Sequence, residues 1–468
     1  MSVANPRERL TRRSEEAPAG DVGMWVKMFD PPTESPPTPE LIAPTNPVPE
    51  VMAAAGLANP PPSPHLWETA LLHGLVVATW DNRPGGLQFF TLDQPNNAAA
   101  SGTFPGPTVR IPRGAVFHSS TQGKGPPPHT IHWHGMEPTP MNDGVGHCSM
   151  EIGSYTYQFQ PNFMGFYFYH CHRNTVQHFE FGLYGALIIH TPDAFHASLN
   201  PNGTLNSIPV GASRDGNFRV AANLKGTPLA RLQRNFSPLS APDPRGEFAT
   251  DPHAHTVPYD VEALWVVDDR DSVWSDIAGD AREFFPQHGS IPGVNDQWHR
   301  GIFNEYRSDY WFVTGIPVVP LDGVKRLGNV GRIVPNAVIP PGLNGGIGAN
   351  APGTATQVPI NARVNDTILI RVLDAAYNYA RITFPADVVI IAFDGRALGV
   401  PPFGRYNHSF VLKKGTPILL STARRFDCLM RPTRPMNSFA TVEFLDTQSR
   451  SRGPGQRRQT ARIPIRIR

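Results

Sequence analysis

Short runs in which apolar and polar residues alternate recur along most of this chain, and they predict β-strands. The runs are rich in aromatic and β-branched residues, and glycine and proline stand between them. Examples are TVRIP at 108–112, YTYQFQP at 155–161, YGALIIHTP at 184–192 and DVVIIAFDG at 387–395. Regular short strands without long amphipathic helices predict an all-β chain of antiparallel sandwiches or barrels. A short helix is expected near SDIAGDAREFF, at 275–285.

The predicted strands fall into two blocks, which we take as two domains, at residues 65–200 and 251–447. Residues 201–250, between the blocks, are predicted to be a linker or a long loop. Residues 1–64 form an N-terminal arm that is rich in proline, and the arm is expected to run extended along a surface or to stay disordered. Residues 448–468 are rich in arginine and are predicted to form a basic, solvated C-terminal tail.

Composition narrows the class of protein. The chain has 468 residues, enough for two or three domains, and its 51 prolines are about twice the ordinary frequency, which favours strands and turns over helices. A net charge of +2 gives no reason to expect a nucleic-acid partner. No apolar run approaches the length of a membrane span, so no membrane partner is expected either.

The N-terminal residues are basic but lack the apolar core of a secretory or twin-arginine signal. The sequence as written therefore predicts a cytoplasmic protein, or a periplasmic or secreted one if a leader is missing from it. The three cysteines, Cys148, Cys171 and Cys428, exclude a disulfide scaffold. A bridge between Cys148 and Cys428 remains open beside the simpler expectation of two buried free thiols.

The segment HTIHWHG, at 129–135, holds three histidines in six positions. Side chains alternate between the two faces of a strand. If this segment is a strand, His132 and His134 share one face and His129 points to the other.

The segment YHCHRNTVQH, at 169–178, places a cysteine between two histidines. On a strand, His170 and His172 point one way and Cys171 the other. His178 follows in the next loop and can return to the Cys171 side. Pairing of this strand with HTIHWHG would therefore collect four histidines on one face and a separate ligand set around the cysteine.

The ligand set around the cysteine, His129, Cys171 and His178, is the trigonal His2Cys pattern of a blue copper that transfers electrons. A structural zinc would need a fourth ligand to complete a tetrahedron. The residue in the axial position is expected to be Leu183, which has no ligating atom and would leave copper three-coordinate at a high reduction potential.

These motifs resemble those of the multicopper oxidases, specifically bacterial, laccase-like members with a blue copper in the first domain. HTIHWHG, NDGVGH and YHCHRNTVQHFEFGLYGALII carry the resemblance, and TFPGPTVRIPRG fits the same domain. In the second block, TILIRVLDAAYNYARITF and FDCLMRPT look like a domain of the same kind without copper. The resemblance covers about residues 65–447 and implies two cupredoxin-like Greek-key β-sandwich domains.

The resemblance also implies a role for each ligand. The blue copper, which takes electrons from a reductant, would be held by His129, Cys171 and His178. The second cluster, which reduces O2 to water, would be held by His132 at the type 2 copper and, at the type 3 coppers, by His134, His170 and His172.

Two acids are the predicted catalytic residues. Asp143, in NDG, matches the acid that the family places near the cluster to move protons, although an aspartate before Gly144 can also be a plain turn residue. Glu137 is a weaker candidate for the same work.

The ligand count is incomplete. A trinuclear cluster needs eight histidines, and the first block supplies four. The other H-x-H pair is His253 and His255, in DPHAHT, and whether these residues bind copper is left open. Two copies of the chain facing each other across a two-fold axis would supply eight, so a homo-oligomer that completes the cluster is expected.

Three functions remain in competition. The first is an oxidase that takes electrons from phenols, aromatic amines or metal ions and passes them to O2. The second is a copper nitrite reductase, in which His134 and His170 could give two ligands of a three-histidine site, but His132 and His172 would then be idle. The third is a blue-copper electron carrier with an incomplete second site.

Overall fold

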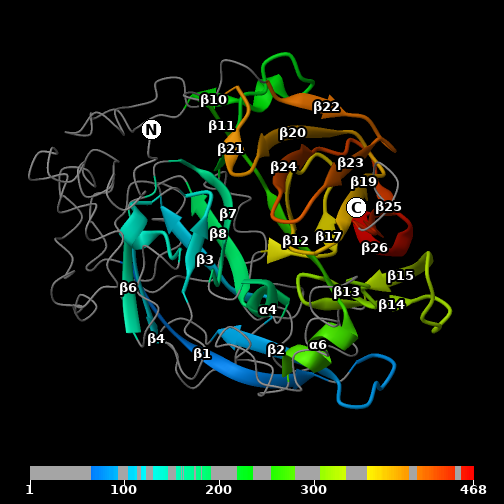
Figure 1. Ribbon diagram of the computed structural model, residues 1–468. Helices are drawn as coiled ribbons and strands as arrows, with labels where there is room; N and C mark the ends of the chain where they lie inside the picture. The colour runs from blue at the N-terminus through cyan, green and yellow to red at the C-terminus, as the bar shows by residue number, and fades with distance from the viewer. Residues whose placement is uncertain are drawn as a thin grey trace, which may run out of the picture.

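The computed structural model describes residues 65–77, 79–92, 104–112, 117–122, 130–136, 138–145, 154–159, 161, 163–172, 175–180, 182–190, 219–235, 255–279, 306–333, 356–399, 408–447 and 455–468. Strands dominate these ranges, so the all-β prediction is confirmed (Figure 1). No helix in the described part of the chain is long and apolar enough to cross a membrane. The proline-rich arm, residues 1–64, lies outside the described residues.

The N-terminal sandwich, residues 65–190, consists of two four-stranded sheets. The first has the order β2-β1-β4-β6 and contains β1 (His65–Val77), β2 (Leu87–Leu92), β4 (Phe117–Gln122) and β6 (Ser154–Phe159). The second has the order β3-β8-β7-β5 and contains β3 (Gly106–Pro112), β5 (His132–His134), β7 (Gly165–His170) and β8 (Tyr184–His190). Trp133 packs between the sheets against Tyr157 and Phe159, with ring centroids 6.1 and 5.0 Å away.

Two strand pairs of this sandwich are parallel, not antiparallel as predicted: β1 with β4, and β3 with β8. Between β1 and β4 the chain passes through β3 of the opposite sheet, and between β3 and β8 it passes through β4 and β6. Each such crossing lets the chain re-enter a sheet in its original direction, which a hairpin does not allow.

The C-terminal sandwich, residues 261–467, is a fifteen-stranded sheet that folds over at β14. One layer contains β12 (Val261–Arg270), β13 (Tyr310–Val313), β16 (Thr356–Gln357), β18 (Ile368–Asp374), β20 (Val388–Phe393), β21 (Arg396–Ala397), β22 (Phe410–Leu412) and β24 (Arg425–Met430). The other contains β14 (Ile316–Pro320), β15 (Asn329–Ile333), β17 (Ile360–Ala362), β19 (Tyr379–Thr383), β23 (Pro417–Leu420), β25 (Met436–Leu445) and β26 (Arg457–Ile467). Because both layers contribute to a single apolar core, they pack face to face.

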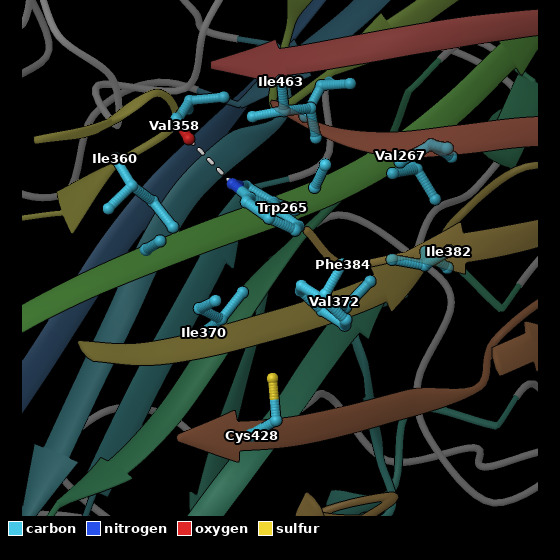
Figure 2. Packing of buried hydrophobic residues seen from close by; sticks show 14 of the residues in the cluster. Trp265, Val267, Val358, Ile360, Ile370, Val372, Ile382, Phe384, Cys428 and Ile463 are labelled. Carbon is cyan, nitrogen blue, oxygen red and sulfur yellow. Dashed lines mark hydrogen bonds between the residues drawn. The ribbon is translucent and has the colours of Figure 1, made fainter. Parts of the chain in front are cut away.

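Figure 2 shows part of this core around Trp265 of β12, with Ile370 and Val372 of β18 and Cys428 of β24 nearby. The Trp265 indole N–H donates a hydrogen bond to the Val358 carbonyl at 2.7 Å, so the buried polar atom of this ring is satisfied. Cys428 and Cys171 are both buried, and neither forms a disulfide with a described residue, while Cys148 lies outside the described residues.

The predicted C-terminal tail is wrong for residues 457–467, which form strand β26. This strand pairs with β25 along its length and also with β15 and β17. Ile463, Ile465 and Ile467 point into the core, and Arg466 between them is exposed. The sequence RIPIRI alternates with period two, but its arginines had suggested a solvated segment.

The predicted linker, residues 201–250, is wrong within its described part, 219–235. Strands β9 (Arg219–Ala221) and β10 (Arg234–Asn235) flank β11 (His255–Pro258) in a small sheet, with the 3-10 turn η3 (Ala230–Leu232) beside them. Val220, Ala222 and Leu224 of this segment pack against the outer face of the C-terminal sandwich. Alternate apolar residues therefore make this stretch a part of the fold.

Three short helical turns complete the described elements: η1 (Pro140–Asn142), α4 (Thr175–Glu180) and α6 (Ser272–Gly279). Helix α6 overlaps the predicted helix at 275–285 but begins earlier. The Asp271 carboxylate caps its N-terminus by accepting hydrogen bonds from the Val273 and Trp274 N–H groups at 2.9 and 3.2 Å.

The C-terminal strand provides a direct test of the fold. We expect Ile463→Ala to lower the free energy of unfolding by about 2–5 kcal/mol, because it leaves a cavity in a closed core. Arg466→Ala, on the exposed face of the same strand, is the control and should change it by less than about 0.5 kcal/mol. Urea unfolding of both variants makes the comparison, and equal stability of the two would contradict the placement of β26.

Candidate metal centre

Pairing of β5 with β7 brings histidines from the two motifs together. His132 lies opposite His170, and His134 lies opposite Phe168. One ring nitrogen from each of His132, His134 and His170 falls within a set whose members are all within 4.8 Å of one another. Nδ1 of His134 lies 3.2 Å from Nε2 of His170, so both nitrogens could bind the same metal ion.

His172 joins the same group from just beyond the end of β7. Its ring centroid lies 5.0 Å from that of His132 and 5.7 Å from that of His170. The His172 backbone N–H donates to the Thr130 hydroxyl at 3.2 Å, which fixes the chain at this point. The four histidines that the sequence predicted to share a face therefore lie together.

Cys171 points to the opposite side, as the alternation of side chains predicts. Its Sγ lies 3.1 Å from Nδ1 of His178, and both residues are completely buried. His178 sits on the six-residue helix α4 and not in a loop as predicted. The third predicted member of this set, His129, lies outside the described residues.

Leu183 lies beside this pair. Its carbonyl accepts a hydrogen bond from the Cys171 N–H at 3.1 Å, and its own N–H donates to the His178 carbonyl at 3.0 Å. The Leu183 side chain is buried in the same apolar cluster as Cys171. It adds no ligating atom and contributes to the exclusion of water from the thiol.

The C-terminal sandwich holds helix α4 in place. Arg270 of β12 is buried with its guanidinium 3.4 Å from Asp268 and 3.9 Å from Glu180, the last residue of the helix. The Glu180 carboxylate also accepts the Asp271 N–H at 3.3 Å. A buried charge without these partners would be costly, so the network constrains the position of His178.

Asp143 contacts His132 directly. Nδ1 of His132 lies 2.6 Å from the Asp143 carbonyl oxygen and 3.2 Å from Oδ1 of the carboxylate. Donation of the Nδ1 proton to these oxygens leaves the Nε2 lone pair for a metal. The following residue, Gly144, has a φ of +72° and packs so closely on the Ile131 carbonyl that a side chain would not fit. The other predicted acid, Glu137, lies outside the described residues.

The grouped histidines are poor bases. Burial, with a further contribution from the positive charge of Arg425, lowers the pKa of His134 to about 3. Burial also lowers the pKa of His132 and, more strongly, that of His170. Neutral imidazole is the form that binds metal ions, so these rings are ready ligands at neutral pH without losing protons.

The C-terminal sandwich faces the histidines with arginines, which the sequence analysis missed. Arg425, at the start of β24, is almost completely buried, and its guanidinium carbon lies 5.2 Å from the centre of the Phe168 ring. Arg396 donates to the Gly135 carbonyl at 3.4 Å, beside His134. No sequence signal marks either residue, since the contact exists only once the two sandwiches pack together.

Among the described residues, the histidine group draws all its rings from the N-terminal sandwich. His255 lies in β11 of the small sheet and is not a member of the group. Its neighbour His253 lies outside the described residues.

Comparison with known proteins agrees with this geometry. Residues 91–194, which include both histidine motifs, match the family described as multicopper oxidase. This segment of the chain is similar to a multicopper oxidase domain. The chain is 37% identical over 103 residues to L-ascorbate oxidase from Cucumis sativus, a match that covers 20% of this chain and 17% of that protein. It is 34% identical over 95 residues to copper resistance protein A from Pseudomonas syringae pv. tomato, covering 19% and 15%.

The match covers less than a fifth of the length of either relative. Among solved structures, the blue copper oxidase from Nitrosomonas europaea aligns over 86% of each chain with 17% identity and a TM-score of 0.46.

The contact between Asp143 and His132 generates a prediction. We expect Asp143→Ala to weaken copper binding by about 10- to 100-fold, because the ring loses one of the oxygens that orient it. Asp322→Ala is the control, since that aspartate bonds Asn329 and Arg326 on the surface of the other sandwich. Competition with a copper chelator measures both affinities, and equal affinities would contradict the role of Asp143.

Proposed function

We propose that the chain is a copper-dependent, laccase-like oxidase that takes single electrons from a reductant and passes them to O2, which is reduced to water. The reductants are phenols, aromatic amines or metal ions. The observation that carries the proposal is the position of Cys171, which lies 3.1 Å from His178 on one side of the strand while its neighbour His170 joins the histidine group on the other.

The donors fit copper by their chemistry. A thiolate and imidazoles suit a blue copper, and Cys171, His178 and His129 would hold it. The histidine group, His132, His134, His170 and His172, would hold the type 2 and type 3 coppers. Bound copper supplies one-electron transfer and the reduction of O2.

The protein's own residues then have distinct tasks. Cys171 is covalently joined to His170 and His172, so the backbone gives the shortest route between the two sites. Leu183 and the surrounding apolar cluster keep water from the thiol. The Asp143 carboxylate lies 3.2 Å from His132 and is partly exposed, a position from which it can pass protons between solvent and the histidine face.

We further propose that a second copy of the chain completes the cluster. Four histidines form only half of the set that a trinuclear cluster needs, and the described residues of the C-terminal sandwich place Arg425 and Arg396 beside that face. A two-fold contact between N-terminal sandwiches would supply the missing ligands by symmetry.

Two cysteines allow a matched test of the proposal. We expect copper-loaded Cys171→Ser to lose both the intense blue absorbance and the uptake of O2 with a phenolic reductant, because the thiolate ligand is gone. Cys428→Ser alters an equally buried thiol in the core of the other sandwich and should keep both.

Absorbance and an oxygen electrode make these measurements on the same samples. Blue absorbance that survives in Cys171→Ser would overturn the ligand assignment. A blue wild-type protein that takes up no O2 would overturn the oxidase and leave an electron carrier.

A further inference from the structure

Three aromatic rings of the C-terminal part of the chain pack together beside the candidate copper ligands. Trp274 of α6, Tyr306 and Tyr377, here the aromatic triad, have ring centroids 5.0 Å apart for Trp274 and Tyr306 and 4.8 Å apart for Tyr306 and Tyr377. Trp274 and Tyr377 lie 5.9 Å apart, so each ring contacts the other two. These spacings are those of rings in direct contact.

The triad is continuous with both candidate sites. Phe179, which follows the ligand His178, has its ring centroid 5.7 Å from that of His170 and 6.1 Å from that of Tyr377. Trp274 and Tyr306 belong to the same buried cluster as Cys171, and Tyr377 packs against it. A path of touching rings therefore leads from the histidine group into the triad.

Tyr306 has a proton acceptor in place. Its hydroxyl donates to the Asp269 carbonyl at 2.7 Å and lies 3.2 Å from Oδ1 of the Asp269 carboxylate. Burial raises the pKa of Asp269 to about 6, so the carboxylate is mostly ionised at neutral pH and can accept a proton. The Tyr377 N–H and the Asn378 amide also donate to this carboxylate and hold it in position.

The other end of the triad lies just beneath the surface. Trp274 is 8% exposed, and Val273, the residue before it on the same helix, is well exposed. Arg307, next to Tyr306, is also exposed, and Tyr377 is only partly buried. An electron donor at this surface would therefore stand next to the triad.

We propose that the aromatic triad carries oxidising equivalents away from the copper-binding face and delivers them to reductants at the surface. This inference rests on the proposed function. The candidate site is surrounded by oxidisable groups, the Cys171 thiol and the histidine ligands, and a path of this kind protects them when a strong oxidant lacks its normal supply of electrons.

The oxidant is hydrogen peroxide, which arises by partial reduction of O2. One H2O2 takes two electrons and two protons from its surroundings to form two water molecules. Tyr306 supplies each electron through Tyr377 and Phe179, and as its O–H bond breaks the proton moves to the Asp269 carboxylate. A one-electron reductant at the surface then returns the electron through Trp274, Asp269 returns the proton, and the phenol is restored. Over two such cycles, two phenolic reductants at the surface release two protons to solvent, and these balance the two protons that one H2O2 consumes.

The test uses electron paramagnetic resonance on full-length, copper-loaded protein mixed with hydrogen peroxide without reductant and then frozen. We expect a tyrosyl radical signal that narrows when the protein is produced with ring-deuterated tyrosine. Tyr306→Phe should lose this signal and should lose its blue absorbance with fewer equivalents of peroxide. Tyr377→Leu, which removes the ring that joins Phe179 to Tyr306, should show the same losses and guards against a folding defect in one variant.

Tyr310→Phe is the matched control. Tyr310 is also buried and also hydrogen-bonded to a carboxylate, Asp81, at 3.0 Å, but it lies outside the triad. It should keep the radical and the resistance to peroxide. A signal unchanged in Tyr306→Phe, or equally lost in Tyr310→Phe, would overturn the proposal.

Copper content and blue absorbance of the same samples separate the two proposals. A copper-loaded, blue protein that reduces O2 but shows no tyrosyl signal overturns the triad proposal alone. A protein that binds no copper overturns both.

Discussion

Strand β7 is buried on both of its faces, and the arrangement of the whole candidate centre depends on that constraint. Tyr167, Tyr169 and then Cys171 point into the core of the N-terminal sandwich. Phe166 and Phe168 point the other way, into a cluster shared with β12 and β13 of the C-terminal sandwich. A shift of the chain by one residue would exchange the two faces and would put the thiol among the histidines. Burial on both sides therefore keeps Cys171 and His178 apart from the histidine group.

The two sandwiches contribute differently to the candidate metal centre. The N-terminal one supplies all the described members of the histidine group and the Cys171–His178 pair. The C-terminal one packs against an edge of that face and leaves His132, His134 and His172 partly exposed. At this edge Arg425 lies over Phe168, and the Tyr167 hydroxyl donates to the Gly395 carbonyl at 2.9 Å. Gly165 lies so close to the Gly395 backbone that a side chain would not fit there, and the Tyr167 ring leaves no room for one on Gly395. In this way the C-terminal sandwich lowers the pKa of His134 without contributing a histidine ring of its own from the described residues.

The sequence alone predicted the features that follow from local alternation. Strand parity placed His132, His134, His170 and His172 on one face and Cys171 on the other, and the structure brings them together in that way. Features that depend on contacts between distant segments were not predictable. Arg425 has no local sequence pattern that points to the histidines. Strand β26 was not predicted because its arginines suggested a solvated tail, although its isoleucines alternate and pair with β25 in the structure. The placement of His129 and Glu137 remains a prediction.

The central claim is that two copper sites, and not one, flank β7. The most direct measurement counts the copper bound per chain in a sample whose mass in solution is known and records its electron paramagnetic resonance spectrum. The account predicts more than one copper per chain, a blue copper and a second, non-blue paramagnetic copper together with copper that gives no signal, in an assembly larger than one chain. A monomer with one blue copper per chain would contradict it, because the histidine face would then hold no metal.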